Sequence, residues 1–311
     1  MPESLRNCTT LYRVRLDGNQ FTGNISEDFG VYPNLYYINL SDNKFYGEIS
    51  HKWGKSLQLT NFEIAGNNIT GSIPPEIGNL TRLRLLNLSS NHLVGRIPME
   101  LGRLTSMLKL ILNDNQLSGG VPQELGSLIE LEYLDLSTNN LSQSIPSSIG
   151  DLAKLHHLNL SKNKFSHGMP IQLGMLLQLS VLDLSHNILA GEIPTDFSSL
   201  DSVVTLNLSH NDLSGVIPSS FVDLRGLEFV DISNNQLSGP IPNNKALQEA
   251  PEEALQGNNG LCGNATGLVP CNNSIGEKKH KSKIGSIVVY IILPTVVGAI
   301  VIASSGIFSL Y

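Results

Sequence analysis

The sequence predicts a repeat solenoid of the α/β type, with a parallel β-sheet on its concave face, followed by one transmembrane helix. Three observations predict it. Apolar residues recur at fixed distances from a repeated asparagine, and the C-terminal 28 residues, 284–311, contain no charged side chain. The asparagine itself recurs ten times at intervals of 24 residues: Asn19, Asn43, Asn67, Asn91, Asn115, Asn139, Asn163, Asn187, Asn211 and Asn235.

Each repeat predicts one coil of the solenoid. Leu-like residues lie eight, five and three positions before the asparagine and two positions after it. A Gly follows four positions after the asparagine, an Ile or Val six positions after it, and a Pro seven positions after it. The alternation before the asparagine predicts a short strand with two inward side chains. The asparagine amide can then bond the backbone groups that the strand no longer pairs. Each such bond nets about 1 kcal/mol, and burying one unpaired group costs roughly 1–3 kcal/mol.

Some repeats depart from this pattern. Ser26 and Ser50 replace the proline in the first two repeats, and Gln143 and His167 replace the glycine four positions after the asparagine. If that glycine slot requires a positive φ, each replacement costs about 1 kcal/mol.

The triplet Asp28-Phe29-Gly30 spells the sequence that holds magnesium in protein kinases. Phe29 and Gly30, however, fill the slots that Trp53 and Gly54 fill one repeat later. We therefore interpret Phe29 as a core residue, Gly30 as a turn and Asp28 as their solvent-side neighbour. The sequence contains no Gly-rich nucleotide loop or His-Arg-Asp loop, so we expect no enzyme activity and no cofactor.

Composition and charge exclude several classes of protein. A hydrophobic content of 41% argues against disorder. Residues 1–276 carry 16 Lys and Arg against 26 Asp and Glu, a net charge of −10. An acidic body without a dense basic stripe is a poor nucleic-acid binder. Nucleic acid is therefore not an expected partner.

The chain divides into four expected parts. Residues 1–242 form the solenoid, 243–276 a C-terminal cap, 277–283 a basic juxtamembrane linker and 284–311 the transmembrane helix. In the cap, Asn259 continues the 24-residue frame, and we expect Cys262 and Cys271 to pair, which implies an oxidising compartment. Cys8 occupies a slot that later repeats fill with Leu, so we expect a buried apolar role for it. Its position places the start of the chain inside a repeat, as in a fragment.

The transmembrane helix follows from length. As a helix, residues 284–311 would span about 42 Å against ~30 Å of hydrocarbon, so a tilted helix, or one kinked at Pro294, fits. The Lys cluster before it favours a cytosolic solenoid by charge counting. The cap cysteines and eleven glycosylation sequons favour an extracellular one, which we prefer: Asn7, Asn24, Asn39, Asn68, Asn79, Asn87, Asn140, Asn159, Asn207, Asn264 and Asn272.

These features together resemble a known family. The repeated IPxxLGxLxxLxxLxLSxNxLxG pattern, the GNNGLCG…PC cap and the single following helix are similar to plant leucine-rich-repeat receptor kinases. Residues 13–50 resemble the male-discoverer-interacting receptor-like kinase group. The family's N-terminal cap, signal peptide and kinase domain are not in this sequence. The resemblance implies a single-pass plasma-membrane receptor whose extracellular repeats bind a peptide and a shorter leucine-rich-repeat co-receptor kinase.

Two alternatives stay open beside that expectation. The chain could be an incomplete piece of a receptor Ser/Thr kinase, or a decoy that binds proteins without signalling.

Side chains six and four positions before each asparagine should point out of the concave sheet, because strand side chains alternate. Arg13 and Arg15 place two guanidinium groups on that face, suited to a carboxylate; the alternative is two solvated charges with Asp17 as a partner. The residues that we predict to contact a ligand are Arg13, Arg15, Tyr37, Lys109, Tyr133, His157 and Phe229. A glycan on Asn39, Asn87, Asn159 or Asn207 would occupy the same face.

A metal site is the main competing chemistry. His186 and His210 share one slot in adjacent repeats and should stack, whereas His156 and His157 point elsewhere. No acid or cysteine completes a ligand set, so we predict no metal site.

Overall fold

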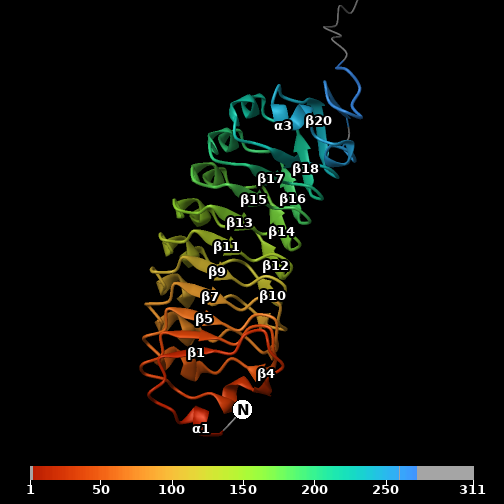
Figure 1. Cartoon of the computed structure of the whole chain (residues 1–311). Coiled ribbons are helices and arrows are strands. Elements are labelled where there is room, and N and C mark those ends of the chain that lie inside the picture. Colours follow the sequence, from red (N-terminus) through yellow and green to blue (C-terminus); the bar gives the residue numbers. More distant parts are fainter. Residues whose placement is uncertain (1–2, 259, 272–311) are drawn as a thin grey trace, which may run out of the picture. The chain divides into compact units, whose positions relative to one another are not determined.

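The computed structural model describes residues 3–258 and 260–271, which form a stack of repeated coils that runs from bottom to top in Figure 1. The basic linker and the transmembrane helix expected at 277–311, and the sequon at Asn272, lie outside the described residues. Among the described residues, no helix is long and apolar enough to cross a membrane.

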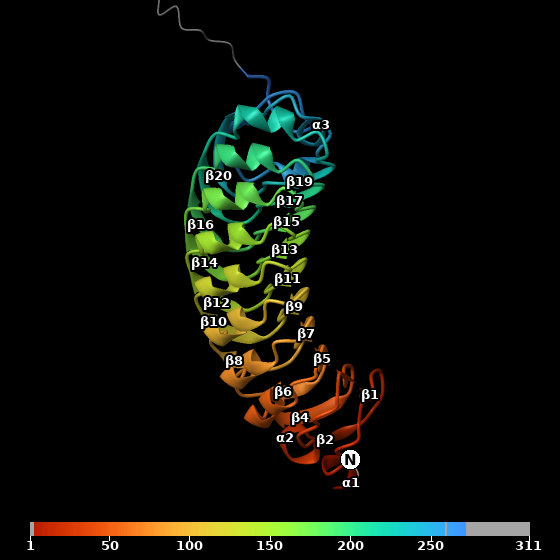
Figure 2. The same ribbon diagram turned by 90° about the vertical axis from the view of Figure 1, so that its left-hand side faces the viewer.

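A ten-stranded parallel sheet runs the length of the solenoid and lines its concave side (Figure 2). Each strand contributes three residues and pairs in register with the same three positions of the next repeat. The strands are β1 (Arg13–Arg15), β3 (Tyr37–Asn39), β5 (Asn61–Glu63), β7 (Leu85–Asn87), β9 (Lys109–Ile111), β11 (Tyr133–Asp135), β13 (His157–Asn159), β15 (Val181–Asp183), β17 (Thr205–Asn207) and β19 (Phe229–Asp231).

Two further parallel sheets cover a second side of the coils. The three-stranded sheet contains β2 (Thr22–Asn24), β4 (Lys44–Glu48) and β6 (Asn68–Thr70). The eight-stranded sheet contains β8 (Val94–Gly95), β10 (Gln116–Gly119), β12 (Asn140–Gln143), β14 (Lys164–His167), β16 (Ile188–Gly191), β18 (Asp212–Gly215), β20 (Gln236–Pro240) and β21 (Gly260–Cys262).

Short helices complete the coils. Eight of the nine described 3₁₀ helices, η2–η9, begin directly after a proline. In η1, Ser50 stands in place of the proline, and its Oγ accepts a hydrogen bond from the Lys52 N–H. The hydroxyl thus satisfies a free N–H at the helix start. The helices are α1 (Glu3–Arg6), α2 (Ile25–Asp28), η1 (His51–Lys55), η2 (Pro75–Asn79), η3 (Met99–Arg103), η4 (Gln123–Ser127), η5 (Ser147–Asp151), η6 (Ile171–Met175), η7 (Thr195–Ser199), η8 (Ser219–Asp223), α3 (Lys245–Gln248) and η9 (Glu252–Ala254).

The predicted asparagine ladder is confirmed. In a typical coil, the Asn163 side-chain amide donates to the carbonyl oxygens of Leu136, Leu160 and Ser161 at 3.0–3.2 Å, and its oxygen accepts from the Leu141 N–H at 3.0 Å. One side chain therefore joins three neighbouring stretches of backbone. In the cap, Asn258 takes this role and bonds Leu237 N–H, whereas the expected Asn259 lies outside the described residues.

The core is one continuous column of apolar side chains inside the coils. Most coils fill it with Leu, but the N-terminal coils use aromatic rings, with Trp53 4.9 Å from Phe62 and 6.0 Å from Phe29 (ring centroids). Phe29 is buried, as expected from its slot.

The glycines that follow Phe29, Trp53 and Leu101 do not have the turn role that we predicted for Gly30. A Cβ on Gly54 would lie 2.3 Å from the Glu76 carbonyl oxygen, and one on Gly102 would lie 2.4 Å from that of Glu124. Glycine is therefore required because the backbone of the next coil approaches too closely for any side chain.

Two other expectations are tested here. The replaced glycine slots do have positive φ, 72° at Gln143 and 67° at His167. Cys8, by contrast, is half-buried rather than buried, with its Sγ 3.6 Å from the Thr10 Oγ1. Among the described residues, only the short helix α1 lies before Cys8 in the chain, and the slot is less enclosed in this structure than its later equivalents.

The cap closes the C-terminal end of the column. Asn244 is buried and donates to the carbonyl oxygens of Phe221 and Leu224. Strand β21 extends the eight-stranded sheet beyond β20, and Cys262 at its end forms the expected disulfide with Cys271, their Cα atoms 4.9 Å apart.

Candidate ligand-binding face

The ten-stranded sheet presents two exposed rows of side chains. In every strand the middle residue is buried, such as Ile38 or Leu134, and the flanking residues are wholly or partly exposed in nearly all strands. The flanking residues are the positions that we predicted for ligand contacts. Because the strands pair in register, equivalent side chains of neighbouring repeats lie next to each other along each row.

At the N-terminal end, the predicted arginine pair is already engaged. The Arg15 Nε lies 2.8 Å from an Asp17 carboxylate oxygen, and this hydrogen bond holds the pKa of Asp17 below its usual range. The Arg13 guanidinium lies 4.4 Å from the centroid of the Tyr37 ring, a cation–π arrangement. A ligand carboxylate could still bind here, but it would compete with Asp17 for Arg15.

Glu63 lies on this face as expected from its position, but it was not among the residues that we predicted to contact a ligand. It lies beside Asn39, whose Nδ2 is 3.5 Å from a Glu63 carboxylate oxygen. Burial raises the pKa of Glu63, and hydrogen bonds from Asn61 and Tyr37 partly offset that rise. A half-buried acid in a polar row can pair with a cationic ligand group. Most repeats hold Asn or Asp in this slot, so the Glu at position 63 was the signal in the sequence.

The middle of the face carries a stacked aromatic pair. Tyr133 and His157 lie in paired positions of β11 and β13 with ring centroids 4.1 Å apart and planes 3° from parallel. Burial lowers the pKa of His157, while the carboxylates of Asp135 and Asp183 act in the opposite direction. The buried His157 Nε2 has no hydrogen-bond partner among the described residues. The sequence predicted both residues but not their contact.

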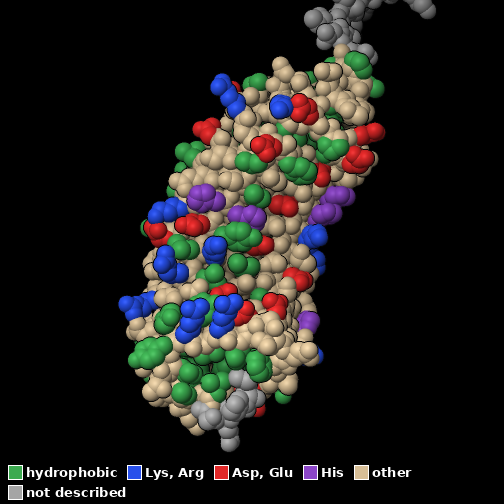
Figure 3. All heavy atoms as spheres, in the orientation of Figure 1, with side chains coloured by type: hydrophobic (Ala, Val, Ile, Leu, Met, Phe, Trp, Pro, Cys, Tyr) green, Lys and Arg blue, Asp and Glu red, His purple; other side chains and the backbone are tan. Residues whose placement is uncertain are grey.

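The remaining two predicted residues lie at opposite sides of this pair. Lys109 is exposed and pairs in register with Tyr133, whereas Phe229 lies in the last strand with its ring 48% exposed. The seven predicted residues therefore share one face but form three separate groups, at the N-terminal end, in the middle and at the C-terminal end. Figure 3, drawn in the orientation of Figure 1, shows that side chains of both charges are interspersed with apolar side chains on the visible surface.

Four sequons of the second row have a structural role. The side-chain oxygens of Asn39, Asn87, Asn159 and Asn207 each accept a hydrogen bond from the backbone N–H two residues later, at 2.9–3.1 Å. Each is half-buried. These contacts pin the end of each strand, in the way that Asn and Asp side chains stabilise turns.

The expected histidine stack is also present. His186 and His210 lie with ring centroids 4.1 Å apart and planes 11° from parallel, and burial, then the neighbouring His210, lower the pKa of His186. Both residues have positive φ, as do all ten residues that directly precede the ladder asparagines. We did not predict this column of left-handed residues; the frequent Gly, Asp, Asn and Ser in the slot were the signal. Within the described residues, no three His, Cys, Asp or Glu side chains gather to hold a metal ion.

Family models match the repeats that the coils define. The Leucine Rich Repeat model matches residues 58–80, 82–104, 130–152 and 154–176, and a second Leucine rich repeat model matches residues 177–237. The chain is a leucine-rich-repeat protein. It is homologous to the MDIS1-interacting receptor like kinase 2 of Arabidopsis thaliana, with 47% identity over 71 residues, which are 21% of this chain and 6% of the relative.

Solved structures of plant receptor ectodomains have the same fold as this leucine-rich-repeat protein. The PEPR1-AtPEP1 crystal structure matches with a TM-score of 0.78 and 35% identity, over 84% of this chain and 37% of that one. The Arabidopsis receptor kinase HAESA, in complex with the peptide hormone IDA and the co-receptor SERK1, matches with a TM-score of 0.73 and 33% identity, over 86% and 49%. The chain thus spans less than half the length of these receptor chains.

The fold also occurs outside receptors. A plant ice-binding protein matches with a TM-score of 0.71 and 27% identity, over 86% of this leucine-rich-repeat chain and 84% of that one. Function therefore has to be argued from the surface residues and not from the fold.

Proposed function

We propose that the chain is the ligand-binding ectodomain of a plant cell-surface receptor, or a truncated remnant of one, and that it binds an extended peptide along the ten-stranded sheet. The observation that carries the proposal is the pair of largely exposed rows on the ten-stranded sheet, in which aromatic rings stand among charged and amide groups. The receptor complexes among the structural relatives support the same class of ligand.

Three groups of residues would contact the peptide. Tyr133 and His157 offer a preordered aromatic surface, and Phe229 offers an exposed ring that a ligand can cover. Arg13, stacked on Tyr37, would bind a carboxylate without breaking an ion pair, whereas Arg15 would first have to leave Asp17. Lys109 would add a positive charge near the middle of the peptide.

The partners follow from the same proposal. A peptide-loaded face would recruit a shorter leucine-rich-repeat co-receptor kinase, and the apolar segment 284–311 would anchor the chain in the plasma membrane as a single span with the repeats outside. The sequons and the Cys262–Cys271 disulfide support an extracellular position. No enzymatic step is assigned to this chain.

The proposal is tested by peptide capture. The full chain, produced in the plant secretory pathway, is incubated with the peptide fraction of plant extracellular fluid, and retained peptides are identified by mass spectrometry. A Tyr133→Ala, Phe229→Ala double variant should lose at least about tenfold of the captured peptide, because aromatic anchors dominate such interfaces. The matched control, Tyr46→Ala in β4, removes an aromatic ring that is 50% exposed on the other sheet.

Two outcomes contradict the proposal. If the wild type and the double variant capture the same amount of peptide, the concave face is not the binding surface. Binding of the SERK1 ectodomain at the same level with and without peptide would favour a protein-binding decoy over a peptide receptor.

A further inference from the structure

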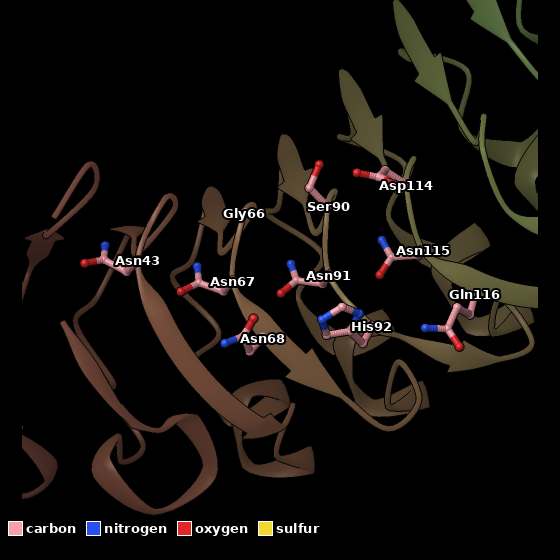
Figure 4. A pocket seen from close by; sticks show the side chains of 10 residues that line it. All are labelled: Asn43, Gly66, Asn67, Asn68, Ser90, Asn91, His92, Asp114, Asn115 and Gln116. Atoms are coloured by element: carbon pink, nitrogen blue, oxygen red, sulfur yellow. The ribbon is translucent and has the colours of Figure 1, made fainter. Parts of the chain in front are cut away.

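A polar hollow lies across the N-terminal repeats, and none of its lining residues is among those proposed to contact the peptide. It has a volume of about 460 Å³ and is lined by residues of four successive repeats around the asparagine ladder. Figure 4 shows its layout: Asn43, Asn67, Asn91 and Asn115 form a central row, with Ser90 and Asp114 on one side and Asn68, His92 and Gln116 on the other.

One wall position of the hollow has no side chain. The slot that holds Ser90 and Asp114 in the later repeats holds Gly66 in the earlier one. Gly66 has φ +60°, and a Cβ there would lie 2.5 Å from the Asp42 Oδ1. This part of the wall, on the other side of the asparagine row from Asn68, therefore adds no side chain to the hollow.

The central row cannot bind a ligand, because its hydrogen-bonding groups are already used. The Asn91 Nδ2 donates to the carbonyl oxygens of Ile64, Leu88 and Ser89, and its Oδ1 accepts from the Ile69 N–H. Recognition therefore falls to the walls.

The walls have the opposite property. Within residues 3–258 and 260–271, the side chains of Asn68, Ser90, His92, Asp114 and Gln116 take part in no hydrogen bond or ion pair. They offer amide, hydroxyl, imidazole and carboxylate groups, which together provide donors and acceptors in close alternation. Such a set suits a molecule dense in hydroxyl groups and without an apolar body, and the volume lies within the ~300–1,000 Å³ typical of small-molecule sites.

One wall residue can itself carry such a molecule. Asn68 begins the sequon Asn68-Ile69-Thr70, is exposed and lies at the rim of the hollow. We propose that the hollow is a cradle for the first sugar residues of an N-linked glycan on Asn68, which it holds against the wall formed by Ser90, His92, Asp114 and Gln116. The glycan would then cover this side of the N-terminal repeats and leave the ten-stranded sheet free.

Asn140 provides a matched comparison. It occupies the same slot of its repeat as Asn68, begins the sequon Asn140-Leu141-Ser142, is equally exposed and starts strand β12. It does not line the hollow, and Thr138 stands two positions before it, where Gly66 stands before Asn68. A glycan on Asn140 should therefore project into solvent.

The test is native deglycosylation, and it rests on the extracellular location in the proposed function. The full chain is produced in secretory cells that add high-mannose glycans, and treated with endoglycosidase H without denaturation; site-resolved mass spectrometry follows each sequon. Cleavage at Asn68 should be about tenfold slower than at Asn140, because seated sugars make additional hydrogen bonds that must break first. After denaturation the two rates should be equal.

A double variant, Asp114→Ala with Gln116→Ala, should raise the native rate at Asn68 to that at Asn140 and leave Asn140 unchanged. Equal native rates in the wild type, or a glycan on Asn140 with none on Asn68, would overturn this inference alone. Absence of glycan from every sequon, together with retention of the chain in the cytosol of these cells, would overturn the extracellular assignment as well.

Discussion

The side-chain oxygen of Asn163 accepts a hydrogen bond from the backbone N–H of Leu141, 22 residues earlier in the chain, at 3.0 Å. Leu141 lies in β12, a strand of the eight-stranded sheet, in the preceding coil. The contact therefore ties one coil to the next, at the point where the backbone of Asn163 has left the concave strand. The same bond recurs down the ladder, from Asn43 to Asn258. The ladder therefore carries stability between coils as well as within them.

Asn163→Ala should lower the free energy of unfolding by about 2–4 kcal/mol, because it leaves several buried backbone groups without partners. Its Nδ2 bonds three carbonyl oxygens, and Asn163 is 9% exposed. Chemical denaturation followed by circular dichroism measures the change. The control, Asn140→Ala, removes an exposed asparagine and should change stability by less than about 0.5 kcal/mol. Equal losses in both variants would contradict a special role for the ladder.

Gly102→Ala should destabilise the solenoid by about 1–3 kcal/mol, because the added Cβ meets the Glu124 carbonyl oxygen at 2.4 Å and the coils have to move apart. Gly168→Ala is the matched control, since its Cβ would have the Ala190 oxygen at 3.8 Å as its neighbour. Thermal unfolding of the two variants compares them directly. If Gly168→Ala is the more damaging, close coil stacking is not the reason for the glycine.

Thr138→Asn should stabilise the chain by about 0.5–1 kcal/mol. Thr138 has φ 52°, a left-handed conformation that disfavours a β-branched residue and that Asn tolerates. Thr205→Asn, the control, replaces a threonine in the extended strand β17, where the change should be neutral or destabilising. A rise in melting temperature for Thr138→Asn only is the expected result; a fall would show that the threonine makes a contact worth more than the strain.

Acidification should weaken the fold through His157. Burial lowers the pKa of His157 in the folded chain, so below the ordinary histidine pKa of about 6.5 the unfolded chain binds more protons than the folded one. Stability is therefore greatest above that pKa and falls as the pH drops through it. Melting temperatures between pH 7.5 and 5.5 measure the slope, which should become shallower in His157→Gln. A His157→Gln variant with an unchanged slope would show that the titration of another group controls the acid response.

The spacing of one residue type determined most of this architecture. Ten asparagines at a constant interval predicted the coil, the strand before each asparagine and the direction of every side chain on the concave sheet, because a period-two strand leaves only two faces. The same periodicity identified Phe29 as core rather than as part of a magnesium-binding triplet. It also predicted the stacking of His186 on His210, since equivalent slots of adjacent coils must lie side by side.

Only the tertiary structure decided what depends on distances between coils. The 2.4 Å approach of the Glu124 oxygen to a Cβ at Gly102, the pairing of Arg15 with Asp17, the contact of Tyr133 with His157 and the hollow beside Asn68 arise from rotamers and from the separation of backbones. A linear pattern states which slots are neighbours, but it does not contain the few tenths of an ångström that decide whether two groups touch, exclude each other or leave room for a ligand.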